Sequence, residues 1–438
     1  MFLARILVGL VTRAANHPCR RAVVSIVSAR MQVSTARRRA CITGFGALSA
    51  IGHSAAALWE GLLAGRCGLE PIRSFDTAGV SIARAGEVKD FQPETRLSPA
   101  EIRRFDRIHQ FGLFATREAL EDGHLNLGRI DPSRVGVILA TSVGGMMIGE
   151  DYQHSQTHGG PFVARRLFDF PYYATGTTLA RVLGVRGPAI SPSIACASGT
   201  ATIGMALDFI RLGYADVFVV GGAETVCSFV VNGFNCLRAT TADVVRPFDA
   251  RRAGLLVGEG AAVLIVEERA HARARGARID VEVVGAGLAG DATHMAAPAR
   301  DGAGAARAMR MALREARVTA PEIDFISAHG TGTVYNDAME IAAITSVFGE
   351  AAARIPVNSI KGALGHTLAA AGTFEAIMCA QVLRTGMIPA TLNCEQPDPS
   401  CGVDLVVGVP RRHAARTVLS TSSAFAGNNA AIVLRREV

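Results

Sequence analysis

A lone cysteine stands where a predicted helix begins. Residues 193–202 read SIACASGTAT, and apolar residues from Ile203 to Ile210 recur at helical spacings, which predicts a helix that starts at or near Cys196 and ends near Gly213. The free N–H groups and the dipole at a helix N-terminus stabilise a thiolate and lower the pKa of a cysteine. The position therefore favours a nucleophile, and a buried structural thiol is the alternative.

Two histidines stand next to glycines at the boundaries of other predicted elements. Phe325–Ser327 is predicted to be a buried strand, and His329 follows it at the head of HGTGT. Strand ends are where α/β proteins build their sites. His366 ends KGALGH and precedes a second helix with small residues in its first half, which could pack closely against the helix after Cys196. The cysteine and the two histidines are therefore candidates for one site.

A lysine and three acidic residues lie near these histidines in the sequence. Lys361 adds a cation, and carboxylates that could hold it are offered by Asp337, Glu340 and Glu375. For Glu340 and Glu375, which lie on predicted amphipathic helices, ordinary exposed positions are the alternative.

Apolar runs along the chain indicate a mixed α/β protein. The predicted strands are Ala40–Gly46, Val135–Ala140 and Val217–Gly222, and the last two are nearly continuous in apolar residues, as expected for a sheet covered on both faces. Helices are predicted over Ala55–Leu63 and Ala303–Ala316. No Pro-rich or Ser-rich linker divides the chain. The Gly-x-Gly turn after the first strand lacks the third glycine of a nucleotide-binding loop and is better explained as a tight turn.

Composition narrows the functional class. Of the 438 residues, 49% are hydrophobic and 19% are charged, which suits a large folded enzyme. The nine cysteines are odd in number and include no Cys-x-x-Cys pair, which indicates a reducing compartment and a cytoplasmic location. The net charge of +7 favours an acidic partner. Nucleic acid is a poor alternative, because aromatic interleaving and a known binding motif are missing.

The N-terminal segment differs from the rest of the chain. Residues 1–38 contain many arginines and no acidic residue, since the first acidic residue is Glu60. This composition resembles a transit peptide, which would imply mitochondria, but translation that starts at Met31 is the favoured interpretation. The apolar run Phe2–Val11 is interrupted by Arg5 and is too short to span a bilayer. No other stretch is predicted to do so.

Several further motifs occur in order along the chain. They are ACASG at 195–199, GGAE at 221–224, RPFD at 246–249, GEGAA at 258–262, DATHM at 291–295, HGTGT at 329–333, KGALGH at 361–366 and FAGNNA at 425–430. Together they resemble the two-histidine group of the β-ketoacyl-acyl-carrier-protein synthases, condensing enzymes with the thiolase fold. The resemblance covers nearly all of residues 39–436. It implies an α/β protein with two similar halves in a layered αβαβα architecture.

The resemblance also implies domains, a reaction and partners. The domains would be an N-terminal extension over residues 1–38, a half with the nucleophile over 39–287, and a half with both histidines over 288–438. The enzyme would be an acyltransferase that condenses malonyl-carrier protein with an enzyme-bound acyl group in fatty-acid or polyketide synthesis, without a metal or redox cofactor. Its partners would be acyl carrier protein and acyl and malonyl thioesters. It would form a homodimer, or a heterodimer with a silent partner subunit.

The resemblance assigns roles to the central residues. Cys196 would take the acyl group, and the backbone N–H groups of Cys196 and Phe425 would form the oxyanion hole. His329 and His366 would donate ring N–H groups to the malonyl thioester carbonyl, a task for neutral imidazoles.

Further positions follow from the same resemblance. Lys361, held by Asp337 and Glu340 with Glu375 close by, would organise the histidine site. The implied substrate-pocket residues are Val143 and Phe234, and the implied carrier-protein contacts are Arg103, Arg104 and Arg238.

The second half of the chain departs from the family pattern at its C-terminal gate and after the HGTGT motif. The usual C-terminal gate reads SFGFGGTN, whereas residues 422–429 read SSAFAGNN, so that Phe425 lies between Ala424 and Ala426 where glycines are usual. Less backbone freedom is expected in this loop. After HGTGT, residues 334–340 read VYNDAME in place of the usual Pro-Leu-Gly-Asp type of turn, which favours synthases of specialised pathways such as aryl polyenes or other polyketides.

Related classes fit less well. A thiolase needs a second active-site cysteine near its C-terminus, and no cysteine follows Cys401. Initiating synthases pair one histidine with an asparagine. A chain-length factor, which is a silent binding subunit, normally lacks the cysteine that Cys196 supplies here. The two-histidine enzyme is therefore favoured, and dependence on a silent partner subunit stays open.

Overall fold

The computed structural model describes residues 37–437, and the chain from Arg39 onward forms one compact unit. The interpretation that concerns Met31 and all but the last two residues of the predicted N-terminal extension, residues 1–38, fall on residues 1–36, which lie outside the described part. Within the described part, no helix combines the length and the apolar character needed to cross a membrane.

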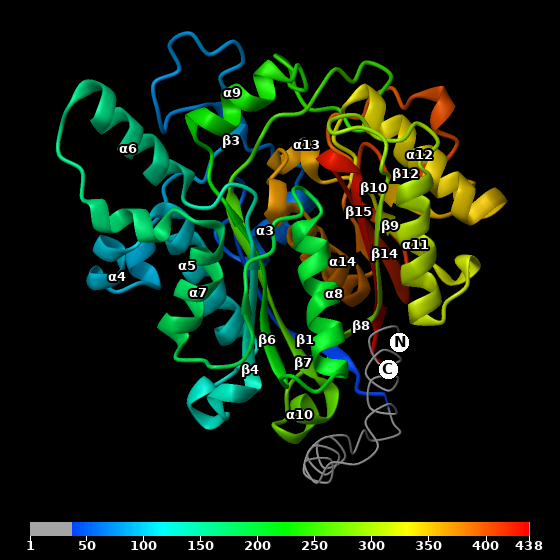
Figure 1. The fold of residues 1–438 in the computed structure, drawn as a ribbon. Helices are drawn as coiled ribbons and strands as arrows, with labels where there is room; N and C mark the ends of the chain where they lie inside the picture. Colours follow the sequence, from blue (N-terminus) through cyan, green and yellow to red (C-terminus); the bar gives the residue numbers. More distant parts are fainter. Residues whose placement is uncertain (1–36, 438) are drawn as a thin grey trace, which may run out of the picture. The chain divides into compact units, whose positions relative to one another are not determined.

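The core of the protein is an eleven-stranded sheet (Figure 1). Its strand order is β12-β10-β9-β14-β15-β8-β1-β7-β6-β4-β5. The first part of the chain supplies β1 (Ala40–Ser49), β4 (Val135–Ala140), β5 (Ala189–Ile190), β6 (Val217–Glu224) and β7 (Gly260–Glu268). The second part supplies β8 (Val281–Gly290), β9 (Phe325–Ser327), β10 (Pro356–Asn358), β12 (Asp404–Leu405), β14 (Thr417–Ala424) and β15 (Asn428–Arg436).

The two parts of the sheet repeat one topology. Leaving aside the edge strand β12, the third strand of each part lies outermost and is followed by the second, fourth, fifth and first. In both parts the three outer strands are parallel and the remaining pairs are antiparallel. The parts meet where β1 pairs with β8. Since the second repeat starts with β8 at Val281, the boundary predicted after residue 287 would cut through this strand.

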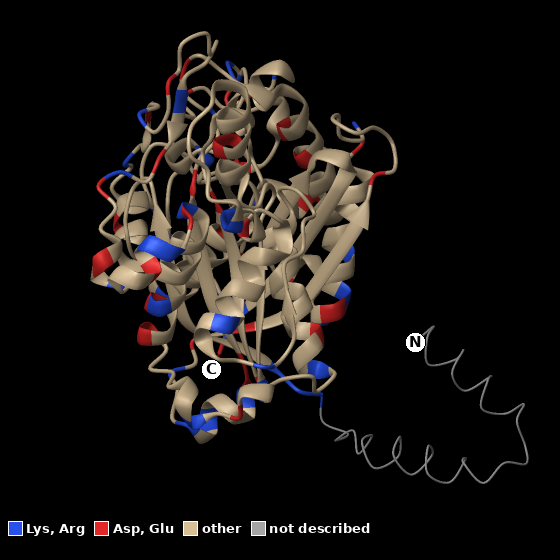
Figure 2. Cartoon of the chain, turned by 60° about the vertical axis from the view of Figure 1, so that its left-hand side comes forward, with Lys and Arg blue, Asp and Glu red and all other residues tan. Residues whose placement is uncertain are grey.

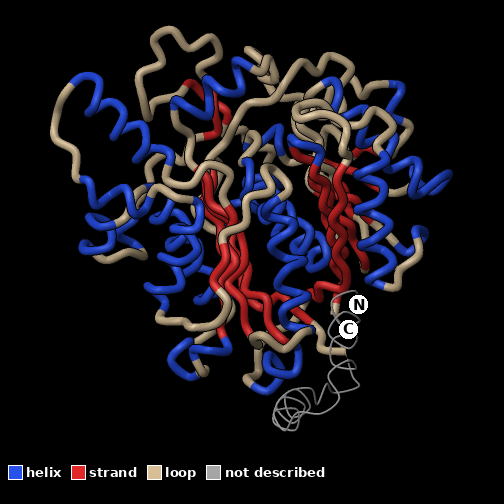
Figure 3. Tube along the Cα trace, viewed as in Figure 1, coloured by secondary structure: helices blue, strands red, loops and turns tan. Residues whose placement is uncertain are grey.

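Helices and the two parts of the sheet form five layers (Figure 3). α5 (Arg107–Asp122) and α7 (Tyr172–Leu183) pack on the first part of the sheet. α11 (Ala303–Ala316) packs on the second part, with α12 (Val334–Phe348) beside it. Two further helices lie between the two parts, which confirms the predicted αβαβα architecture.

These two central helices approach each other closely. They are α8 (Ser198–Arg211) and α14 (Ala371–Thr385). A Cβ atom at Gly199 would lie 2.6 Å from a carbonyl oxygen of the facing segment, and one at Gly372 would lie 2.1 Å from the hydroxyl of Thr200. Glycine is therefore required at this crossing, where the small residues of both predicted helices meet.

Local sequence explains where the outer elements form. The helix α3 (Ala55–Leu63) begins after Ser54, whose side chain accepts the N–H of Ala57 as an N-cap. β4 and β6 are buried at every position, in agreement with their apolar sequences. Figure 2 shows that charged residues lie mainly on the outer helices and loops. The polar residues inside the sheet layers are therefore the candidates for a site.

Candidate active site

The candidate nucleophile lies in a tight turn before α8. Cys196 precedes the first helical residue, Ser198, by two positions and is only 7% exposed. The Ser198 hydroxyl accepts a hydrogen bond from the N–H of Ile194 (2.7 Å) and donates one to the carbonyl oxygen of Ala195 (2.6 Å). Ala195 has a φ of 47°, in the left-handed region that costs a non-glycine residue energy. The turn therefore holds the sulfur in one place at the mouth of the helix.

The pKa of the Cys196 thiol differs from the expectation. Burial raises this pKa to about 12, and the negative charge of Glu224 acts in the same direction. The Lys361 ammonium and the backbone N–H groups of Cys196 and Phe425 oppose the shift. The lowered pKa predicted from the helix terminus is therefore wrong for the resting protein, because the desolvation of a thiolate outweighs the helix dipole.

The two histidines face each other at the same site. The ring centroids of His329 and His366 are 5.1 Å apart, with an angle of 82° between the ring planes, and each residue is 2% exposed. Burial lowers the pKa of both rings well below the usual value, and the Lys361 ammonium adds to this effect. Both imidazoles are therefore neutral near pH 7, which is the state that the expected donor role requires.

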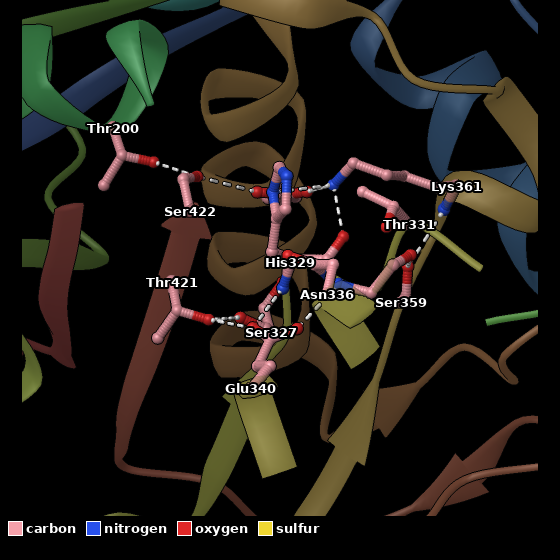
Figure 4. Close-up of polar contacts among 12 residues, drawn as sticks. Thr200, Ser327, His329, Thr331, Asn336, Glu340, Ser359, Lys361, Thr421 and Ser422 are labelled. Atoms are coloured by element: carbon pink, nitrogen blue, oxygen red, sulfur yellow. Dashed lines mark hydrogen bonds and ion pairs between the residues drawn. The ribbon is translucent and has the colours of Figure 1, made fainter. Parts of the chain in front are cut away.

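Lys361 determines which nitrogen of His329 carries the proton. Its Nζ donates to the carbonyl oxygen of His329 (2.5 Å) and lies 3.3 Å from His329 Nδ1 (Figure 4). An ammonium group has donors only, so Nδ1 accepts and the ring proton is on Nε2. His329 therefore keeps an Nε2–H donor for a ligand.

Only one of the three predicted carboxylates holds Lys361. Glu375 Oε1 lies 2.5 Å from Lys361 Nζ, and both side chains are almost fully buried. Glu340 instead accepts the N–H groups of His329 (2.6 Å) and Gly330 (2.8 Å), and burial raises its pKa to about 7.

Asp337 also binds backbone rather than the lysine. It accepts the N–H groups of Phe248 (2.8 Å) and Gly332 (3.2 Å). The prediction that Asp337 and Glu340 hold Lys361 is therefore wrong. Both acids lie on α12, whose first turns face the free N–H groups of the HGTGT loop, so they position that loop and with it His329.

A cavity of about 310 Å³ brings the reactive groups together. The cysteine and both histidines line it, together with Phe425 and the predicted pocket residue Phe234. The other predicted pocket residue, Val143, packs in the apolar cluster that contains Cys196 and is not part of the cavity wall. Among residues 37–437, no group of three or more His, Cys, Asp or Glu side chains has the arrangement of a metal site.

The predicted gate residue, Phe425, belongs to a strained loop. The ring of Phe425 stacks on that of Phe234, with centroids 5.8 Å apart and 26° between the planes. The next residue, Ala426, has a φ of 61° and donates its N–H to the carbonyl oxygen of Met295 (2.7 Å). An alanine with positive φ has fewer alternative conformations than a glycine, which agrees with the expected loss of freedom in this loop.

The predicted carrier-protein contacts lie at two places. Arg238 is exposed and lines the cavity. Arg103 is exposed on α4 (Pro99–Arg104), away from the cavity lining, whereas Arg104 is half-buried and pairs with the buried Asp169. This ion pair neutralises the charge of Arg104 within the protein, and its contact with carrier protein stays a prediction.

One buried acid near the cysteine, Glu224, was not predicted as a site residue from the sequence. Glu224 is the last residue of β6 and accepts the N–H groups of Ser142 and Ala369 and the hydroxyl of Thr141. Burial raises its pKa to about 7. The signal was present in the sequence, because a carboxylate that ends a buried strand lies where α/β proteins place their sites.

Comparison with protein families and curated relatives agrees with this geometry. The model of the beta-ketoacyl synthase N-terminal domain matches residues 37–272, and that of the C-terminal domain matches residues 281–395. The 3-oxoacyl-[acyl-carrier-protein] synthase 2 of Vibrio cholerae is 37% identical over 416 residues, which cover 91% of this chain and 99% of the relative. The protein of the same name from Staphylococcus aureus is 37% identical over 411 residues, which cover 91% and 98%.

Solved structures show the same relationship. The ishigamide ketosynthase/chain length factor structure is 39% identical with a TM-score of 0.88, over 92% of this chain and 100% of the other. A beta-ketoacyl synthase from Burkholderia phymatum is 32% identical with a TM-score of 0.85, over 92% and 100%. Both domain models of the family match this chain in order, and a cysteine and two histidines line one cavity. The chain therefore belongs to the β-ketoacyl synthase family, as a condensing enzyme of the acyltransferase class with a thiolase-like fold.

Proposed function

We propose that this enzyme joins an acyl group held on Cys196 to a malonyl group delivered by acyl carrier protein, in a decarboxylative Claisen condensation. The observation that carries the proposal is the meeting of a buried thiol and two neutral imidazoles on one cavity. The relatives named 3-oxoacyl-[acyl-carrier-protein] synthase 2 support the same reaction.

In the first half-reaction, the Cys196 sulfur attacks the carbonyl carbon of an acyl-carrier thioester. Because the pKa of the thiol is raised to about 12, its proton must pass to a base during the attack, and the neutral imidazoles are the bases that line the cavity. The N–H groups of Cys196 and Phe425 would stabilise the oxyanion. The carbon–sulfur bond to the carrier then breaks, and the carrier leaves as a thiol with that proton.

In the second half-reaction, the bond between the malonyl carbon and its carboxylate breaks and carbon dioxide leaves. The electron pair forms an enolate, whose oxygen would accept hydrogen bonds from His329 Nε2–H and from His366. The enolate carbon attacks the acyl carbonyl on Cys196, and the cysteine thiolate is expelled. The product is a β-ketoacyl thioester on the carrier protein, and the step needs no oxidant or reductant.

Intact-protein mass spectrometry tests the first half-reaction. Wild type incubated with saturated, unsaturated and aryl acyl-carrier thioesters is expected to gain one acyl mass, whereas Cys196→Ala is expected to gain none, because the nucleophile is absent. Cys227→Ala is a matched control, since Cys227 is a buried thiol of the same apolar cluster. An adduct on Cys196→Ala would refute the assignment of the nucleophile.

The preferred adduct also reports on the pathway. A polyketide or aryl-polyene type of substrate is supported by the VYNDAME turn and by the 39% identity to the ishigamide ketosynthase/chain length factor structure. Equal or better acylation by saturated medium-chain donors would argue for ordinary fatty-acid elongation.

An acidic carrier protein is proposed to dock near the cavity through exposed arginines. Arg103→Glu and Arg238→Glu are each expected to raise the KM for carrier protein about 3-fold to 10-fold with little change in kcat, because a reversed charge at the contact slows association. Arg314→Glu, at an exposed position of α11, is the charge-matched control. An unchanged KM would remove the substituted arginine from the contact.

A specific observation favours a partner subunit as well. The aromatic residues Phe168, Tyr172 and Tyr173 are 76%, 47% and 64% exposed, and α7 carries the two tyrosines beside β5, the edge strand of the sheet. An apolar surface next to an open strand edge is typical of a protein interface. The partner is a second copy of the chain or a silent chain-length factor, as in the solved complex of a ketosynthase with its chain length factor from Xenorhabdus doucetiae.

The mass of the purified enzyme in solution distinguishes these partners. An active homodimer is expected if the chain needs only its own copy. A monomer, or a homodimer that is acylated but does not condense, would favour the heterodimer. A cytoplasmic location is part of the proposal and is supported by the eight described cysteines, none of which forms a disulfide.

A further inference from the structure

A buried series of hydrogen bonds connects α8, the helix that follows Cys196, to the ion pair between Glu375 and Lys361. Thr200 Oγ1 on α8 lies 2.8 Å from Ser422 Oγ on β14 (Figure 4). Ser422 Oγ in turn lies 3.4 Å from Glu375 Oε2. The other oxygen of Glu375, Oε1, binds Lys361. The carboxylate is thus held from two sides, by an ammonium and by a hydroxyl.

The chemistry of these groups sets the direction of each bond. An ionised carboxylate only accepts, so the Ser422 hydroxyl donates to Glu375. A hydroxyl has one proton, and Thr200 must therefore be the donor in its bond with Ser422. Thr200 therefore donates to Ser422, and Ser422 donates to Glu375.

Because these groups are buried, the loss of one hydrogen bond affects the protonation of Glu375. Thr200, Ser422 and Glu375 are each 1% exposed, so solvent is not at hand to replace a lost donor. A buried carboxylate that loses one of its donors holds its proton more tightly. A neutral Glu375 would no longer balance the Lys361 ammonium, and that ammonium orients His329 through Nδ1.

We propose that Ser422 is a positioning residue for the decarboxylation half-reaction: its hydroxyl keeps Glu375 ionised, and Glu375 keeps Lys361 in place to hold the Nε2–H form of His329. Thr200 supports Ser422 from the nucleophile helix. This inference rests on the proposed function and adds two residues to it that do not line the cavity.

The test separates the two half-reactions in Ser422→Ala. Acylation of the enzyme by an acyl-carrier thioester is followed by intact mass, and decarboxylation of malonyl-carrier protein by carbon dioxide release, from pH 5 to pH 9. We expect acylation within about twofold of wild type and a loss of decarboxylation that is greatest at low pH. The acid limb of its pH profile should move to higher pH by up to about one unit, since the Ser422–Glu375 distance of 3.4 Å is long for a hydrogen bond to a charge.

The sign of this shift follows from Glu375. Without its hydroxyl donor, Glu375 has a higher pKa and is protonated over more of the pH range, so activity is lost from the acid side. The titratable groups that act on Glu375 are Lys361 on α13 (Lys361–Leu364) and, on its own helix, Cys379, with His329 beyond the lysine. Burial raises the pKa of Cys379 and lowers that of His329 well below its usual value, so both shifts favour the neutral form of the group.

Ser420→Ala is the matched control. Ser420 lies two residues earlier on β14, on the same face and fully buried, and its hydroxyl has no hydrogen-bond partner among the residues that the structure describes. It removes a hydroxyl from the same strand without touching Glu375, and both half-reactions and the pH profile should match wild type. Thr200→Val should give a smaller shift than Ser422→Ala, and Thr200→Ser, which keeps the donor, should give none.

Each result either supports or contradicts the proposed role of Ser422 or the proposed function. If Ser422→Ala behaves like Ser420→Ala, or if both half-reactions fall together without a shift in the acid limb, the inference is wrong and Ser422 is merely structural. If wild type itself neither gains an acyl mass nor releases carbon dioxide, the proposed function fails instead.

Discussion

Replacing His366 with alanine is expected to lower the rate of malonyl decarboxylation by about 10²-fold to 10³-fold, the usual effect of removing one donor to a developing oxyanion. The backbone of His366 should remain in place, because its N–H donates to Leu256 and its carbonyl accepts from Gly258. The variant should therefore fold and still be acylated at Cys196, although more slowly if this imidazole takes the thiol proton. Carbon dioxide release and intact mass measure the two effects.

An exposed histidine that does not line the cavity provides the control. His158, exposed at the end of α6 (Met146–His158), can be changed to alanine and should leave both half-reactions at wild-type rates. Decarboxylation by His366→Ala at more than about a tenth of the wild-type rate would remove His366 from the enolate site.

Replacing Lys361 with methionine is expected to lower the free energy of unfolding by about 3–5 kcal/mol, because it leaves the buried Glu375 without its counter-ion. Decarboxylation should also be lost, since nothing then selects the tautomer of His329. Urea unfolding at several pH values measures the change in stability.

The stability loss has a defined pH dependence. Burial raises the pKa of Glu375 above its usual value, and removal of the lysine raises it further. A group whose folded pKa is raised contributes stability below its unfolded pKa and loses it as the pH rises through the folded pKa. Lys361→Met should therefore be closest to wild type near pH 4.5 and fall behind as the pH increases.

The double variant Lys361→Met/Glu375→Gln is the control for this prediction. It removes both charges, so it should regain much of the stability at pH 8 and lose the pH dependence, while remaining unable to decarboxylate malonyl thioester. A single variant whose stability loss is the same at pH 5 and pH 8 would show that the charge of Glu375 is not the cause.

Features that depend on local sequence could be predicted. β4, α3 and α11 have the predicted bounds, because uninterrupted apolar runs and helical spacing act over a few residues. The grouping of Cys196 with the two histidines was predictable from where each stands relative to a strand or helix end. The order of the motifs, through the family resemblance, predicted that the chain has two similar halves.

Features that depend on tertiary packing could not. The helix terminus near Cys196 predicts a lower pKa, but the degree of burial, which the sequence does not report, decides the sign. Three carboxylates are close to Lys361 in the sequence, and only the packing of α14 selects Glu375. The hydroxyl of Ser422 meets that carboxylate only because β14 lies beside α14.

The repeated strand order means that neither half of the chain contains a complete site. α8 and α14 hold equivalent places, each leading from the third strand of its repeat toward the fourth, and the cysteine precedes one while the histidine His366 precedes the other. A chain cut between α10 (Arg269–Ala274) and β8 would yield two inert fragments. Activity should return only when the two fragments reassociate through the pairing of β1 with β8. The recovered activity should therefore rise with the concentration of the fragments, which makes the enzyme suitable for a fragment-complementation assay.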